Sequence, residues 1–235
     1  MIKIPDDKLI YSGSLLCMDP MLIAEQMKLT EEIIDYWHVD FLDGQTTYKR
    51  FGCYPEQMGR LKSISDKPIE AHMMVEDTEQ WLPLLKDNGA DIVSIHISGE
   101  RQPIRTMEKI TKAGMAPCIV ANLDTTPEQL AEAVSTALPV MIEFMSINPG
   151  MVGTNVYLNV VDSKIKRLYE ICPDAMYLPL AIDGGVRAST ALDIYKRIGI
   201  NYQVCGSVLY DVKQFDPLKM QEKIDILKSI KEQTL

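Results

Sequence analysis

The sequence lacks the long apolar run of a membrane helix and the basic cluster of a nucleic-acid-binding protein. No stretch of about 18 uninterrupted apolar residues occurs among its 235 residues, so we expect no membrane-spanning helix. Residues 1–7 lack the apolar segment of a signal peptide. The formal net charge is −9 and no lysine and arginine cluster offsets it, which disfavours nucleic acid and anionic membranes as partners.

Cysteine is scarce as well. The five cysteines are odd in number and scattered along the chain, and no two of them form a C-x-x-C pair. Neither a disulfide framework nor a zinc finger is indicated. We therefore expect free thiols and a cytoplasmic location, where the environment is reducing.

What the sequence does contain is a regular alternation of short apolar runs and longer amphipathic stretches. The apolar runs, which predict buried parallel strands, are 9–17, 36–42, 69–75, 92–97, 116–123, 140–147, 177–182 and 202–206. The amphipathic stretches, which predict helices, are 21–34, 55–64, 81–88, 102–113, 127–136, 158–171, 188–198 and 215–232. A doubly wound open sheet seldom needs so many units, and no G-x-G-x-x-G follows the first strand. The pattern predicts an α/β protein with one domain over residues 1–235, a single (β/α)8 TIM barrel.

The three histidines all fall inside expected strands. His38 and Asp40 are two residues apart, so their side chains share one face of a strand. His72 and His96 occupy later strands, and Asp183 ends the seventh. Barrel enzymes carry their chemistry at the C-terminal ends of the strands, where two imidazoles and two carboxylates could bind Zn²⁺, Mn²⁺, Fe²⁺ or Co²⁺. For one such histidine alone, a hydrogen-bonded core residue would be the simpler interpretation.

Glycines gather in the loops that follow the sixth, seventh and eighth strands. Loops in this part of a barrel often bind phosphate, because glycine lets backbone N–H groups approach an anion closely. The expected phosphate-binding residues are Gly150, Met151, Val152, Gly153, Gly184, Gly185, Gly206 and Ser207.

Five motifs resemble those of the ribulose-phosphate 3-epimerase family, in the same order along residues 9–210. They are GSLLCMD at 13–19, HVDFLDG at 38–44, HMMV at 72–75, MSINPG at 145–150 and IDGGV at 182–186. The LCMD segment at 16–19 is also similar to the related allulose-6-phosphate 3-epimerases.

The resemblance implies an isomerase of carbohydrate metabolism. Its reaction would convert D-ribulose 5-phosphate to D-xylulose 5-phosphate, in the pentose phosphate pathway, through an enediolate. The implied ligands of the divalent metal ion are His38, Asp40, His72 and Asp183, of which Asp40 and Asp183 would also be the catalytic acid and base. The implied substrate-binding residues are Ser14, His72, Met74 and Met145.

The main departure from the family is the loop at 45–55, which is polar, basic and slightly longer than usual. Lys49 and Arg50 could reach a longer or more anionic substrate, or could be solvated loop charges. Val152 stands where the family commonly has a smaller residue. We expect this loop to overhang the active site. Its departure from the family pattern therefore affects the prediction of which sugar is the substrate more than the prediction of the reaction type.

Three other functions are compatible with parts of this pattern. The nearest is an allulose-6-phosphate 3-epimerase. A barrel decarboxylase or lyase would typically need a catalytic lysine on a strand, where this chain has histidine and aspartate. A non-catalytic phosphosugar-binding barrel would not need the four expected metal ligands, and their presence in this sequence disfavours that function. Family analogy further implies a homo-oligomer, a dimer or a hexamer.

Overall fold

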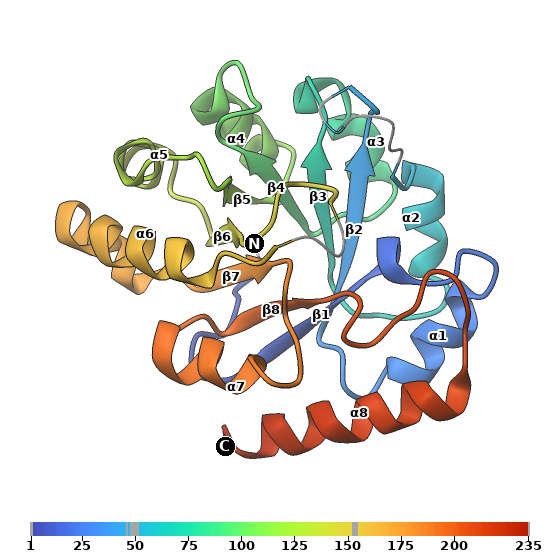
Figure 1. The fold of residues 1–235 in the computed structure, drawn as a ribbon. Coiled ribbons are helices and arrows are strands. Elements are labelled where there is room, and N and C mark those ends of the chain that lie inside the picture. Colours follow the sequence, from blue (N-terminus) through green and yellow to red (C-terminus); the bar gives the residue numbers. More distant parts are fainter. Residues whose placement is uncertain (1, 46, 48–51, 152–154, 235) are drawn as a thin grey trace.

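Eight parallel strands form a closed barrel in the computed structural model, which describes residues 2–45, 47, 52–151 and 155–234 (Figure 1). Each strand pairs with the next in chain order, and the first also pairs with the eighth. The strands are β1 (Ile10–Ser14), β2 (Tyr36–Leu42), β3 (Ile69–Met74), β4 (Ile92–His96), β5 (Ala116–Ala121), β6 (Met141–Met145), β7 (Leu180–Asp183) and β8 (Tyr202–Cys205). The (β/α)8 TIM barrel predicted from the alternation is thereby confirmed.

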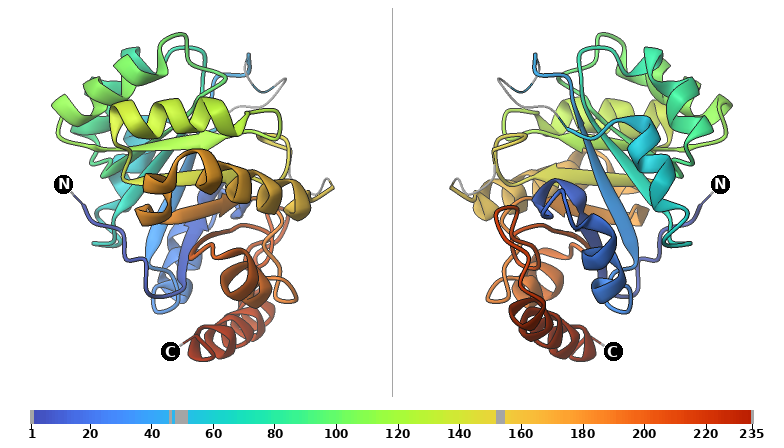
Figure 2. Two further views of the ribbon diagram at one scale, coloured as in Figure 1. Left: turned by 90° about the vertical axis from the view of Figure 1, so that its left-hand side faces the viewer. Right: turned by 90° about the vertical axis from the view of Figure 1, so that its right-hand side faces the viewer.

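Helices cover the outside of the barrel, as the two side views of Figure 2 show. The α-helices of the described residues are α1 (Ile23–Thr30), α2 (Pro55–Leu61), α3 (Leu82–Asp87), α4 (Pro103–Lys112), α5 (Pro127–Ala137), α6 (Leu158–Ile171), α7 (Ala191–Asp193) and α8 (Pro217–Glu232). Shorter helical segments are η1 (Leu15–Cys17), η2 (Thr78–Gln80), η3 (Pro173–Tyr177) and η4 (Ile194–Ile198). None of the helices in this described part of the chain combines the length and apolar character needed to cross a bilayer.

Local sequence signals explain where several helices begin. Thr126 caps α5 by accepting a hydrogen bond from the backbone N–H of Gln129, and the side chain of Gln129 accepts one from the backbone N–H of Thr126. Pro127 then occupies the first helical position, where its missing N–H costs nothing. Asp216 caps α8 in a similar way.

Strand boundaries differ most from the expected ones at two strands. The first expected strand, 9–17, ends at Ser14, because the next three residues form the helical turn η1. The seventh was expected at 177–182, but β7 runs from Leu180 to Asp183. Pro173 starts the helical segment η3, which ends at Tyr177, the first residue of the expected strand. Asp183 nevertheless ends the seventh strand, as expected.

The inside of the barrel is divided along its axis into an apolar and a polar part. Toward the N-terminal ends of the strands lies a buried apolar cluster that includes Ile10, Tyr36, Ile92 and Met141. The residues two positions further along the same strands share the inward face and are polar. They are Ser12, His38, Ser94 and Glu143, all fully buried.

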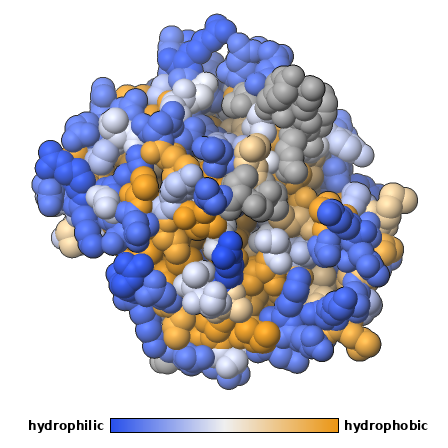
Figure 3. All heavy atoms as spheres, in the orientation of Figure 1, coloured by the Kyte–Doolittle hydropathy of each residue, from blue (hydrophilic) through white to orange (hydrophobic). Residues whose placement is uncertain are grey.

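Apolar and polar side chains are also separated on the surface, in a different arrangement. On the face drawn in Figure 3, apolar side chains gather around the centre, and hydrophilic side chains predominate along the outline. The concave ligand site of a barrel is expected at such a face.

Candidate active site

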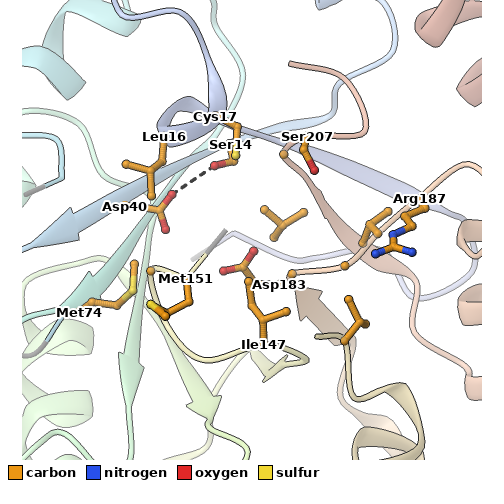
Figure 4. Close-up of a pocket in the computed structure, with 17 residues that line it drawn as sticks. Ser14, Leu16, Cys17, Asp40, Met74, Ile147, Met151, Asp183, Arg187 and Ser207 are labelled. Atoms are coloured by element: carbon orange, nitrogen blue, oxygen red, sulfur yellow. Dashed lines mark hydrogen bonds between the residues drawn. The ribbon is translucent and has the colours of Figure 1, made fainter. Parts of the chain in front are cut away.

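A pocket opens at the C-terminal ends of the strands (Figure 4). Most of the site residues expected from the sequence line it. They are Ser14, Asp40, Met74, Gly150, Met151, Asp183, Gly184, Gly185, Gly206 and Ser207. His38, His72 and Met145 do not line the pocket and are buried. Val152 and Gly153 lie outside the described residues.

Four polar side chains converge below this pocket. The Nδ1 atom of His72 lies 3.0 Å from Nε2 of His38, 3.3 Å from Oδ1 of Asp40 and 3.8 Å from Oδ2 of Asp183. Nε2 of His38 is 3.2 Å from Oδ1 of Asp40. Donor atoms bound about 2.0–2.1 Å from a tetrahedral ion are about 3.3–3.4 Å apart. The observed spacing therefore fits one divalent cation.

Hydrogen bonds orient the first of these histidines. Nδ1 of His38 lies 3.0 Å from Oε2 of Glu70, a fully buried carboxylate. Glu70 also accepts hydrogen bonds from Tyr202 and Ser94. Because a carboxylate is an acceptor, Nδ1 of His38 donates to Glu70. Nε2 faces Asp40 and His72, and in the neutral ring it carries the lone pair that a cation would bind. A carboxylate behind a histidine is the usual outer partner of a metal ligand.

A chain of three side chains orients the second histidine. Asn122 donates from Nδ2 to Ser98, which leaves its Oδ1 to accept from Nδ1 of His96 at 2.6 Å. Nε2 of His96 lies 2.7 Å from Nε2 of His72 and can then only accept. Burial lowers the pKa of His96 to about 3, which keeps its ring neutral. His72 thus donates from Nε2, and its Nδ1 has a lone pair facing the centre.

The two aspartates at the centre have pKa values displaced in opposite directions. Burial alone would raise the pKa of Asp40. Protons on the facing nitrogens of His38 and His72 hold it well below its usual range, and a cation in their place would act in the same direction. Burial raises the pKa of Asp183, and the charge of Asp40 adds to that effect. Such a pair can supply one base and one acid. Burial also raises the pKa of Cys17 to about 12, so this pocket thiol is not a thiolate.

Glycine is required by the backbone along one wall of the pocket. Gly184 has a φ of +91°, and a Cβ added there would lie 2.5 Å from Cγ1 of Ile147. Gly150 has a φ of +69°, and an added Cβ would lie 2.4 Å from Cγ2 of Thr47. Both positions therefore require glycine, and the phosphate-binding role expected of these loops stays a prediction.

The loop at 45–55 reaches this wall through Thr47. Thr47 is buried, and its methyl group contacts the Cα side of Gly150. Lys49 and Arg50, which the sequence analysis singled out in the same loop, lie outside the described residues.

Three residues of the site were not found from the sequence. Glu70 and Glu143 are acids inside buried strands, two positions before His72 and Met145. The signal that could have identified both glutamates is their position inside otherwise apolar strands, because ionisable residues are rarely buried without a partner. Arg187 follows the glycine pair of the seventh loop and lines the pocket.

A metal could be held here by more than one combination of these residues. His38, His72, Glu143 and Asp183 each offer a ligand atom, and these atoms lie within 4.8 Å of one another. Asp40 lies within 3.3 Å of both histidines, as described above.

Comparison with known proteins gives the family. The model of the ribulose-phosphate 3-epimerase family matches residues 10–210. The ribulose-phosphate 3-epimerase of Helicobacter pylori is 29% identical over 203 residues, covering 85% of this chain and 90% of that protein. The chloroplastic ribulose-5-phosphate-3-epimerase of Arabidopsis thaliana is 30% identical over 213 residues, covering 88% of this chain and 73% of that protein.

Solved structures at lower identity share the fold. A mutant tryptophan synthase alpha-subunit from Pyrococcus furiosus superposes with a TM-score of 0.69 at 14% identity, covering 94% of this chain and 97% of that one. A 3-hexulose-6-phosphate synthase gives 0.67 at 14% identity, covering 93% and 99%. The five sequence motifs, the barrel and the family match agree, and the chain belongs to the ribulose-phosphate 3-epimerase family.

Proposed function

We propose that the protein is a metal-dependent 3-epimerase that interconverts D-ribulose 5-phosphate and D-xylulose 5-phosphate. The observation that carries this proposal is the pair Asp40 and Asp183, which line one pocket and lie 3.3 Å and 3.8 Å from Nδ1 of His72. His38, Asp40, His72 and Asp183 would hold the ion. A bound divalent cation supplies positive charge that stabilises the enediolate. The oxygen and imidazole donors suit Zn²⁺, Mn²⁺, Fe²⁺ or Co²⁺.

The two aspartates account for the change of configuration. Epimerisation removes the proton from C3, next to the carbonyl, and returns a proton to C3 from the opposite face. In each turnover one carboxylate accepts the C3 proton while the other, already protonated, delivers its own. The low pKa of Asp40 and the raised pKa of Asp183 support this division of roles. Ser14 donates a 3.2 Å hydrogen bond to Oδ2 of Asp40 and fixes its orientation.

Two methionines make the site apolar around the reacting carbons. Met74 lines the pocket, and Met145 is buried directly beside Asp183 in the strand register. A polarisable thioether lining excludes water from an enediolate without adding a competing proton donor.

Deuterium exchange at C3 is the experiment that tests the reaction and the substrate together. The protein is incubated in D₂O with D-ribulose 5-phosphate or D-allulose 6-phosphate, and label at C3 is followed by NMR. We expect faster incorporation and product formation with the pentulose. The LCMD segment at 16–19 favours the hexulose as the second candidate, and a faster hexulose reaction would establish it. Absence of exchange with both sugars, in protein that contains metal, would identify a non-catalytic phosphosugar-binding barrel.

Arg187 is expected to contribute to phosphate binding. Its guanidinium has no hydrogen bond or ion pair within the described residues, and Figure 4 shows it across the pocket from Met74 and Asp40. Charge-assisted hydrogen bonds are worth about 1.5–3 kcal/mol. Arg187→Ala should therefore raise KM for the sugar phosphate about 10- to 100-fold with a smaller change in kcat.

Two controls test this prediction: a variant that keeps the positive charge at position 187, and a substrate that lacks the phosphate. Arg187→Lys should recover part of the affinity. Unphosphorylated D-ribulose should react equally poorly with the wild-type protein and with Arg187→Ala. An unchanged KM in Arg187→Ala would leave phosphate binding to the backbone of the glycine loops alone.

The assembly and the cellular compartment stay predictions. We propose a homo-oligomer, a dimer or a hexamer, by analogy with the family, and a cytoplasmic location. The five cysteines are free, which is compatible with a reducing compartment.

A further inference from the structure

Glu143 is a buried carboxylate without a hydrogen-bond partner. It lies in the middle of β6 with no exposed surface, and neither Oε1 nor Oε2 has a partner among the described residues. Its neighbours in the strand register, Val120 and Ala181, have no polar side-chain atoms to offer, and the Glu70 carboxylate and the Cys118 thiol lie within 4.8 Å of it. Burying an unpaired carboxylate costs several kcal/mol, so a group of this kind binds either a cation or a proton.

The Glu143 carboxylate faces the same centre as the expected metal ligands. Its Oε1 lies 3.9 Å from Nδ1 of His72, nearly the same distance as the 3.8 Å of Oδ2 of Asp183. Neighbouring donors in an octahedral sphere with bonds of about 2.1 Å are about 3 Å apart, and opposite donors about 4.2 Å. Ligand atoms of His38, His72, Glu143 and Asp183 all lie within 4.8 Å of one another, so small shifts of these side chains would bring them into one coordination sphere.

The ring of His72 does not supply enough hydrogen bonds for this cluster. Three carboxylates surround Nδ1 of His72, those of Asp40, Asp183 and Glu143. A single ring nitrogen could donate to one of them at most. His72 already donates from Nε2 to His96, so in the neutral ring Nδ1 has a lone pair and donates to none of them. A cation between these atoms would satisfy the three carboxylates and the lone pair at once.

We propose that Glu143 is an additional ligand of the metal ion, which it approaches from the inside of the barrel. This proposal rests on the metal site of the proposed function. A third carboxylate raises the coordination number that the protein can provide above four. Zn²⁺ prefers tetrahedral sites with four ligands. Mn²⁺, Fe²⁺ and Co²⁺ are better suited to sites with more ligands, in which oxygen atoms are combined with imidazole nitrogens. Glu143 therefore biases this protein toward Mn²⁺, Fe²⁺ or Co²⁺ relative to Zn²⁺.

Metal affinity measured without substrate tests this role. Dissociation constants for Mn²⁺, Co²⁺ and Zn²⁺ are obtained by competition with a chromophoric chelator for the wild type, Glu143→Gln and Glu143→Leu. We expect Mn²⁺ and Co²⁺ affinity to fall at least about tenfold in both variants, as losses of metal-site groups generally do. Zn²⁺ affinity should fall less, so that the preference moves toward zinc. Glu100→Gln, which changes a half-buried glutamate outside the site, should leave all three constants unchanged.

The visible spectrum of the Co²⁺-loaded protein provides a second measurement. Ligand-field bands of Co²⁺ become stronger as its coordination number falls. Stronger bands in Glu143→Leu than in the wild type would support the proposal, and Glu143→Gln provides the same comparison if the leucine variant does not fold. Unchanged affinities and an unchanged spectrum in folded Glu143→Gln would overturn it and leave a protonated glutamic acid at this position. If Glu143 contributes to metal affinity but the wild-type protein gives no exchange at C3, the proposed function is refuted, and the role of Glu143 as a metal ligand still holds.

Discussion

Replacing Asp183 by asparagine is expected to lower kcat for C3 epimerisation by about 10²- to 10⁴-fold, the usual contribution of a positioned acid or base. Asparagine has nearly the same shape but cannot accept or deliver the C3 proton. The measurement is deuterium incorporation at C3 together with product formation. Metal content must be measured on the same sample, because Asp183 also lies 3.8 Å from Nδ1 of His72 and is an expected ligand.

A matched substitution separates the chemistry from the loss of a negative charge. Asp174 is exposed in η3, away from the pocket, and Asp174→Asn should keep wild-type activity. Near-normal turnover in metal-loaded Asp183→Asn would show that another group handles the proton, and the assignment of the acid/base pair would be wrong.

Removing the metal is expected to abolish activity and to lower thermal stability. Without a cation, the carboxylates and imidazole lone pairs around His72 face one another uncompensated. A ligand at about 1,000 times its Kd stabilises the folded state by about 4 kcal/mol. For a chain of this size that corresponds to roughly 8–16 °C in Tm. Dialysis against a chelator should produce both losses, and added Mn²⁺, Co²⁺ or Zn²⁺ should reverse them.

A ligand variant provides the control for chelation. His72→Ala should have little activity from the start, and the chelator should leave its Tm unchanged because little metal is bound. Full activity in wild-type protein from which metal has been removed would contradict a metal-dependent mechanism.

The barrel could be predicted because its signals are local. Each parallel strand is buried on both faces, so it forms a short apolar run whatever its neighbours are. The boundaries of β7 were missed because Pro173 restarts a helical segment just before it, and a sequence pattern does not show whether such a turn packs as helix or as strand.

The site could be predicted in part for a similar reason. His38 and Asp40 share a face because strand side chains alternate, which requires no knowledge of the fold. Glu143 and Glu70 lie deeper, and their closeness to the histidines depends on the stagger of β3 and β6 around the closed barrel. Arg187 lies in a loop, where no periodicity indicates which way a side chain points.

The apolar cluster at the base of the barrel has a consequence for the order of binding events. Ile10, Tyr36, Ile92 and Met141 fill the N-terminal end of the described barrel, and the pocket opens at the C-terminal ends of the strands. Under the proposed function, the cation and the sugar phosphate would both enter there, and the cation would lie deeper because His38 and His72 are buried behind the pocket lining. Metal would then have to bind first and leave last, and a bound sugar would trap it. Substrate then slows the loss of its own cofactor, and a working enzyme resists chelators that strip a resting one.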